Sequence, residues 1–113
     1  MKIITEPTSL SELWSSREVG FEDMMKAVVD VEQEIIGVDA ELHADLEALL
    51  LDHGSMQYNL WGINIYPDKT DEDFIEFTAL INIRPSQRNR SMEVENPHTR
   101  DLIRHICIRL LKR

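Results

Sequence analysis

A short polar stretch, NIRPSQRNRS at residues 82 to 91, concentrates the side chains best suited to binding an anion. A guanidinium group can hold a phosphate or a carboxylate through two parallel hydrogen bonds, and neighbouring amides can add neutral donors. The stretch therefore predicts an anion-binding loop. The residues expected to contact the anion are Arg84, Gln87, Arg88, Asn89 and Arg90.

A second interpretation of the same arginines needs no ligand. The guanidinium groups could form an internal latch on the chain's own carboxylates, with Asp30 and Glu32 as acceptors. An Arg90→Ala substitution separates the two, because breaking a buried latch should lower stability by about 2 to 4 kcal/mol. In a ligand pocket the same substitution should leave stability nearly unchanged or raise it.

The acidic residues in the middle of the chain form a second group with a chemistry of its own. In the stretch ELHAD a histidine alternates with acids, so a strand here would place all three polar side chains on one face. Acids from a neighbouring strand would complete a mixed set of oxygen and nitrogen ligands that suits Mn, Fe or Zn. The candidate ligands are Asp30, Glu32, Glu41, His43 and Asp45. The ordinary alternative is a solvated strand face.

Motifs for other chemistries are missing. The chain has no G-x-x-x-x-G-K phosphate cradle and no H-E-x-x-H pair, and it offers no nucleophile candidate beyond scattered serines. Cys107, the single cysteine, is expected to be a small core residue of a helix. His98, Asp101 and His105 fall on the opposite face of that helix, where exposed ion pairs are expected. The cofactor stays unknown, and the question of enzymatic activity stays open.

The charge of the chain is unevenly distributed. The net charge is −9, yet residues 84 to 113 hold eight Lys or Arg and three acids, a local +5, while residues 1 to 83 carry −14. The acidic total argues against general nucleic-acid binding, because phosphate neutralisation supplies most of that affinity. A basic segment can still hold one local anion, or it can fold back on the acidic body.

The length and the apolar segments bound the architecture. We expect 113 residues to form one domain, 1 to 113, with a single core. The longest apolar run is Ala48 to Leu51, far below the roughly 20 residues of a membrane helix. The start MKIITEP lacks the apolar segment of a signal peptide, so we expect a cytoplasmic protein with no membrane contact.

Local patterns predict the elements that would position these groups. KIIT predicts a strand, and Ser9 with Glu12 has the spacing of a capping box for a helix running to about Val19. The alternation in residues 26 to 45 predicts two antiparallel strands joined near residues 33 to 36. Their polar face would carry Asp30, Glu32, Glu34, Asp39, Glu41 and His43, and Val29, Val31, Val38, Ala40 and Leu42 would lie on the other face.

The second half of the chain contains one ambiguous element. Residues 44 to 53 have the leucine spacing of a short helix ending at Gly54, but could also be the first arm of a hairpin. Residues 60 to 66 and the stretch FIEFTALINIRP predict further strands. Asn96 as N-cap, with Pro97 in the first turn, starts a helix whose apolar stripe repeats to the C-terminus.

These elements predict an α+β fold. We expect an antiparallel-rich sheet of four or five strands, with the N-terminal and C-terminal helices packed on one face.

Four strings carry a resemblance to a known family: KAVVDVE, ELHADLEALLL, LWGINIYPDK and INIRPSQRNRS, in this order. Through them the chain resembles a family of small prokaryotic single-domain proteins catalogued as a domain of unknown function. The resemblance covers nearly the whole chain and implies a prokaryotic single-domain protein with no assigned activity.

Two classes of function are consistent with these observations. The favoured class is a non-enzymatic binding or interaction protein with a polar groove between the acidic hairpin and the arginine loop. Such a groove could take a small anionic ligand, and it could lie at a homodimer interface. The alternative is a small metal- or phosphate-dependent enzyme that uses the acidic and histidine residues opposite the arginines.

Overall fold

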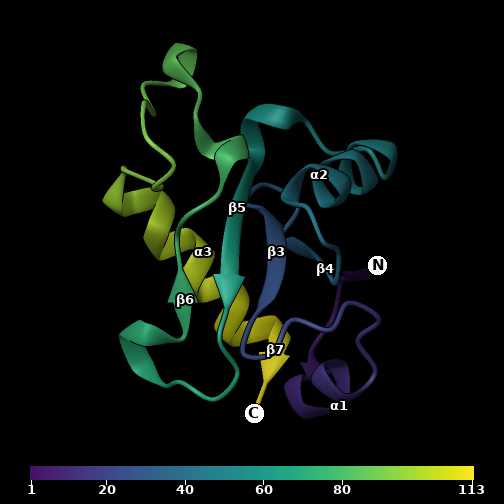
Figure 1. Cartoon of the computed structure of the whole chain (residues 1–113). Helices are drawn as coiled ribbons and strands as arrows, with labels where there is room; N and C mark the ends of the chain where they lie inside the picture. The colour runs from purple at the N-terminus through teal and green to yellow at the C-terminus, as the bar shows by residue number, and fades with distance from the viewer.

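A five-stranded antiparallel sheet forms the centre of the computed structural model, which describes all 113 residues (Figure 1). Its strands are β1 (Lys2–Ile4), β3 (Met25–Asp30), β4 (Ile35–Val38), β5 (Leu60–Ile65) and β6 (Ile75–Glu76), in the order β1-β4-β3-β5-β6. Two short strands, β2 (Thr8–Ser9) and β7 (Leu111–Lys112), pair in parallel outside this sheet. The helices are α1 (Leu10–Ser15), α2 (His43–Asp52) and α3 (Pro97–Leu110). The expected α+β class is confirmed.

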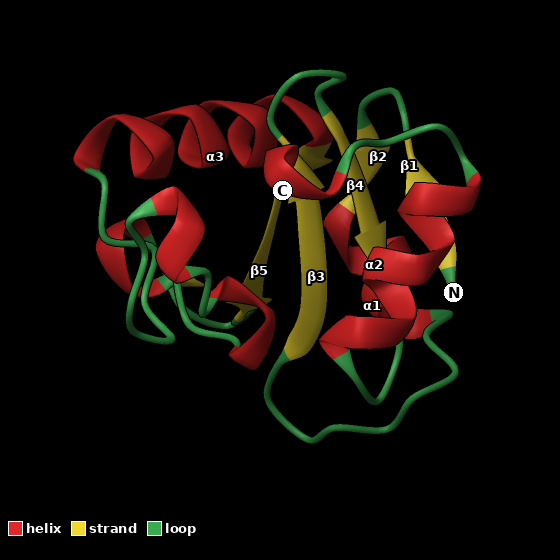
Figure 2. Ribbon diagram, turned by 90° about the horizontal axis from the view of Figure 1, so that it is seen from above, coloured by secondary structure: helices red, strands yellow, loops and turns green.

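Helices cover both faces of the sheet (Figure 2). On one face α1 and α3 pack against alternate residues of β3, such as Ala27 and Val29, in the larger of two apolar clusters. On the other face Leu46 and Leu50 of α2 pack against Val28. The prediction that the first and last helices share a face is therefore confirmed, and the second face has a helix of its own.

The helix starts follow the predicted caps. The Ser9 side chain accepts a hydrogen bond from the Glu12 amide at 3.3 Å, and Asn96 accepts from the His98 amide at 2.8 Å. These bonds satisfy amides that have no partner within the helix. Helix α1 ends at Ser15 and is shorter than the expected run to Val19.

Residues 44 to 53 lie almost wholly in α2, so the helix interpretation is confirmed and the hairpin alternative is wrong. Leu46 and Leu50, one turn apart, are fully buried, which explains why the helix forms here. The chain leaves the helix through Gly54, whose φ of 98° is accessible to glycine at little cost.

The acidic hairpin differs from the prediction in its turn and in its faces. The turn spans residues 31 to 34, because the buried Asp30 carboxylate accepts the Glu32 amide at 2.9 Å and the Gln33 amide at 3.0 Å. The side of β3 expected to be polar is covered by α2, and the strand β4 ends at Val38. A continuous acidic face therefore does not form.

The predicted strand FIEFTALINIRP is also much shorter. Only Ile75–Glu76 belongs to the sheet as β6, and a single 3₁₀ turn follows at Leu80–Asn82. The chain between them pairs with a later segment instead, since the Ala79 amide donates to Met92 at 3.1 Å and Thr78 bridges Glu93. Leu80 is consequently 70% exposed.

Candidate functional site

The arginine loop is organised around Arg84, which is buried. Its Nε donates to the Ile81 carbonyl at 2.9 Å, one terminal nitrogen donates to the Gln57 carbonyl at 2.9 Å, and the other donates to the Leu60 carbonyl. The guanidinium also lies 4.7 Å from the Trp61 ring centroid. Burial lowers the pKa of Arg84. Its donors are occupied by the main chain, so Arg84 holds the loop to β5 rather than facing a ligand.

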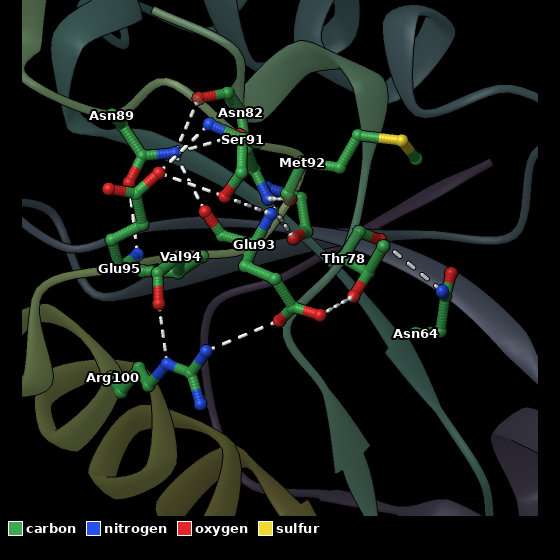
Figure 3. Close-up of polar contacts among 11 residues, drawn as sticks. Asn64, Thr78, Asn82, Asn89, Ser91, Met92, Glu93, Val94, Glu95 and Arg100 are labelled. Carbon is green, nitrogen blue, oxygen red and sulfur yellow. Dashed lines mark hydrogen bonds and ion pairs between the residues drawn. The ribbon is translucent and has the colours of Figure 1, made fainter.

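Asn89 closes the same loop from within. Its side-chain nitrogen donates to the carbonyls of Asn82, Ser91 and Glu93 at 2.8, 3.1 and 2.7 Å, and its oxygen accepts the Glu95 amide at 2.9 Å. Figure 3 shows Asn89 at the centre of these contacts. A buried amide with this many partners is a structural group.

The loop is closed from outside by Glu95. This carboxylate accepts the Arg90 amide at 3.0 Å and both the amide and the hydroxyl of Ser91 at 2.8 Å. The hydrogen bonds from Ser91 lower the pKa of Glu95. Arg90 thus enters the network through its backbone alone.

Of the five predicted anion-binding residues, two keep free charged side chains. Arg88 and Arg90 are exposed and form no ion pair or side-chain hydrogen bond. Gln87 bridges Arg84 and the Tyr58 carbonyl. The predicted five therefore lie in one loop, but they do not converge on one pocket.

The alternative of a latch on Asp30 and Glu32 is wrong in its partners. The Asp30 carboxylate binds the Ser55 hydroxyl at 2.6 Å and the Gln33 amide nitrogen at 3.0 Å, and Glu32 is exposed. An internal anchor does exist, in Arg84, but its acceptors are backbone carbonyls.

The five predicted metal ligands are not brought together. Asp30 is enclosed in the β3–β4 turn, Glu32 is exposed in that turn, and Glu41 is exposed before α2. His43 and Asp45 lie in the first turn of α2, so the alternation expected of a strand does not apply to them. No group of three or more His, Cys, Asp or Glu side chains is arranged to hold a metal ion.

A cavity of about 530 Å³ opens beside the start of α2, on the face of the sheet that this helix covers only in part. Five separate stretches of the chain supply its walls: one at β3, one at the start of α2, one in β5, and the two segments that meet at the Thr78–Glu93 bridge. Its lining is mainly apolar. The lining residues are Met24, Lys26, Leu42, His43, Ala44, Asn64, Thr78, Ala79, Leu80, Ile81 and Met92.

Gly62 shapes the sheet beside this cavity. A Cβ at Gly62 would lie 2.5 Å from Cβ of Ala79 and 3.1 Å from Cγ1 of Ile81. The side-chain amide of Asn82 meets the Gly62 backbone on its free edge, accepting from the amide at 2.8 Å and donating to the carbonyl at 2.9 Å. The wall of the cavity can approach β5 this closely only because residue 62 has no side chain.

Two of the four polar residues that line the cavity belong to the sheet. Lys26 of β3 and Asn64 of β5 are directly opposite each other in the strand pair. The Asn64 nitrogen donates to Glu76 at 2.7 Å and to the Thr78 carbonyl at 3.3 Å, whereas its buried oxygen has no hydrogen-bond partner. Figure 3 shows the bond to Thr78. The Lys26 ammonium has no ion pair and lies 5.3 Å from the Phe21 ring centroid.

His43 is the remaining titratable group of the cavity. Its Nε2 lies 2.8 Å from the Ile63 carbonyl, so this nitrogen carries the proton. Burial, reinforced by the positive charge of Lys26, lowers the pKa of His43 against the opposing effect of the bond to Ile63. The imidazole is therefore neutral at neutral pH.

Sequence reasoning singled out His43, but for a different chemistry, and it missed the other lining residues. Lys26 and Asn64 stand 38 positions apart and become neighbours only through the β3–β5 register. The one local signal was a glycine inside an otherwise apolar strand, in LWGIN, which is typical of a close approach to that strand.

Comparison with known proteins adds the family. The family model described as Protein of unknown function (DUF5674) matches residues 2–110. The chain belongs to the DUF5674 family. Neither the curated proteins nor the solved structures gave a match to this DUF5674 member. None of its helices combines the length and the apolar character needed to cross a bilayer.

Proposed function

We propose that this DUF5674 protein is a non-enzymatic binding protein, and that it holds a small molecule with an apolar body in the cavity beside α2. The observation that carries the proposal is the cavity itself. Its volume of about 530 Å³ lies within the range of roughly 300 to 1,000 Å³ that is usual for small-molecule sites. An apolar lining with a few polar groups is the usual composition of such sites.

The rim of the cavity supports this proposal. Leu42, Leu80 and Met92 are exposed by 57%, 70% and 39% although all three are large apolar residues. Exposed apolar side chains gathered around a concavity are a mark of binding sites. Methionine, with its flexible and polarisable side chain, adapts well to the shape of a ligand.

The chemistry of the lining favours binding over catalysis. Its titratable groups are one ammonium and one neutral imidazole, with no carboxylate or thiol beside them. The metal-dependent enzyme considered from the sequence would need its acidic residues and His43 grouped as ligands, and no group of three or more His, Cys, Asp or Glu side chains is arranged to hold a metal ion. We therefore propose the cavity beside α2 as the binding site, in place of the groove expected between the acidic hairpin and the arginine loop.

A pair of tryptophan variants tests the proposal with a neutral dye, N-phenylnaphthylamine, whose fluorescence rises in apolar surroundings. Ala44 lines the cavity and Ala48, one turn later in α2, does not; both are exposed. We expect the dye to bind the unmodified protein, Ala44→Trp to abolish binding by filling the cavity, and Ala48→Trp to leave the dissociation constant unchanged. Absence of binding, or equal effects of the two variants, would refute the proposal.

A further inference from the structure

We infer that the ligand of the cavity is an organic anion whose acidic group pairs with Lys26. The inference rests on the proposed function, and it adds the chemical class of the ligand. It also moves the expected anion away from the arginine loop, where the sequence pattern had placed it.

The first argument is the isolation of the Lys26 charge. Residues 1 to 83 contain eighteen acids and only four Lys or Arg, yet the Lys26 ammonium has no carboxylate within 4.0 Å. The residue lies on β3, the central strand of the sheet, and is half-buried. Lys26 lines this cavity and also a neighbouring hollow formed with Phe21 and Glu41. A half-buried cation in the wall of an apolar cavity attracts an anion more strongly than one at an open surface, because less water screens it.

The second argument is that the neighbouring groups leave this charge uncompensated. His43 is neutral and is bound to the main chain, so it neither repels nor neutralises an anion. The carboxylate of Glu76 lies outside the lining and is engaged by the Asn64 nitrogen. Lys26 is therefore the only formal charge in the cavity wall.

The third argument is the apolar lining around this charge. Seven of the eleven lining residues are hydrophobic, and Leu42, Leu80 and Met92 are exposed at the rim. A molecule with an apolar body would cover these walls, and an acidic head on it would pair with the Lys26 ammonium.

Two dyes that differ in charge can test the inference. Anilinonaphthalene sulfonate is N-phenylnaphthylamine with an added sulfonate, so the pair isolates the acidic group. In fluorescence titrations we expect Lys26→Met to raise the dissociation constant of the sulfonate dye about tenfold, which is the scale of one charge-assisted hydrogen bond. The dissociation constant of the neutral dye should change by less than about twofold. Lys26→Arg should restore the binding of the sulfonate dye.

Matched variants separate the remaining outcomes. Lys69 is also a lysine beside an aromatic ring, at 4.5 Å from the Tyr66 centroid, but it does not line the cavity, so Lys69→Met should change neither dye. Equal affinity of the sulfonate dye for Lys26→Met and the unmodified protein overturns the inference. If an Arg88→Met, Arg90→Met double variant no longer binds the sulfonate dye, the inference is also overturned, and the arginine loop is the anion-binding site.

Failure of the proposed function would look different. In that case the neutral dye does not bind, or Ala44→Trp and Ala48→Trp affect it equally. If the neutral dye binds and Ala44→Trp abolishes its binding, while Lys26→Met leaves the affinity for the sulfonate dye unchanged, the proposed binding function stands and the anionic ligand is rejected.

Discussion

At the scale of single residues, the structure depends on a few positions where one atom decides whether two segments can meet. Gly62 is the clearest of these, because the Ala79 side chain occupies the space in which its Cβ would lie. We expect Gly62→Ala to lower the free energy of unfolding by about 1 to 3 kcal/mol through overpacking. Urea denaturation measures this difference.

Gly20 provides the control for that substitution. It has no atom within 4 Å of an added Cβ and no positive φ. We expect Gly20→Ala to change stability by less than about 1 kcal/mol, in the stabilising direction, since the unfolded chain loses freedom. If Gly62→Ala is as stable as Gly20→Ala, the segment that contains Ala79 can shift away from β5 at little cost in free energy.

Arg84 and Arg90 give the second prediction at this scale. Arg84→Met leaves three carbonyls of the loop and of β5 without their donor, so we expect a loss of at least about 2 kcal/mol in urea denaturation. Arg90→Met removes an exposed side chain and should change stability by less than about 0.5 kcal/mol. The opposite order would mean that Arg90 anchors the loop. The sequence identified the arginines but could not say which of them turns inward.

At the scale of the elements, the sequence was most informative where the signals were local. Ser9 and Asn96 cap the helices that their neighbours predict, and the apolar stripe of α3 is buried as its period requires. Local signals suffice there because a cap and a helix face involve residues only a few positions apart.

The sequence misled where pairing was decided by distant segments. The alternation in FIEFTALINIRP suits a strand, but residues 77 to 79 pair with residues 92 to 94, and the chain then turns away. Likewise Asp30 reads as one more strand acid, whereas it caps a turn together with Ser55, 25 positions later. The cavity could not be predicted for the same reason, since five separate stretches of the chain build it.

Helix α2 carries a prediction about pH because His43 stands in its first turn. Burial lowers the pKa of His43 below its ordinary value of 6.5 in the folded protein. The unfolded chain therefore binds the proton more readily, so this contribution to stability is complete above pH 6.5 and decreases as the pH falls below it.

We expect His43→Gln, which retains a donor for the Ile63 carbonyl, to remove this part of the pH dependence. The measurement compares urea denaturation of the variant and the parent protein on both sides of pH 6.5. Carboxylates titrate equally in both proteins and cancel in the difference. His105→Gln, at an exposed helix position, serves as the control. A difference between His43→Gln and the parent that does not change with pH would contradict the assignment.

At the scale of the whole molecule, arginines of the basic C-terminal part meet the acidic part through backbone carbonyls and aromatic rings more than through ion pairs. The guanidinium groups of Arg84 and Arg113 lie 4.7 and 4.2 Å from the centroids of Trp61 and Phe74. Arg100 and Arg104 both lie 5.0 Å from that of Phe77. Only one ion pair, Arg109 with Glu34 at 3.2 Å, joins the two parts, and both of its side chains are about half exposed.

This arrangement predicts that salt does not destabilise the protein. Exposed ion pairs contribute little, and screening reduces the mutual repulsion of a chain with net charge −9. Between roughly 0.05 and 0.5 M NaCl, where the Debye length falls severalfold toward the size of a contact, we expect the free energy of unfolding to stay constant or rise. A loss of more than about 2 kcal/mol would show that ion pairs hold the two parts together.

The hydrogen bonds between Asn82 and Gly62 bear on the tendency of the protein to aggregate through the edge of its sheet. Strand β6 is too short to cover the outer side of β5, so the stretch Leu60–Ile63 would offer unpaired backbone groups on an apolar strand. Such an edge invites another chain to add itself, which is a route to aggregation. The amide of Asn82 and the guanidinium of Arg84 occupy the Gly62 and Leu60 backbone groups before a neighbouring molecule can reach them. The loop predicted to bind an anion thus satisfies the backbone groups of an exposed sheet edge, which leaves fewer of them for another strand.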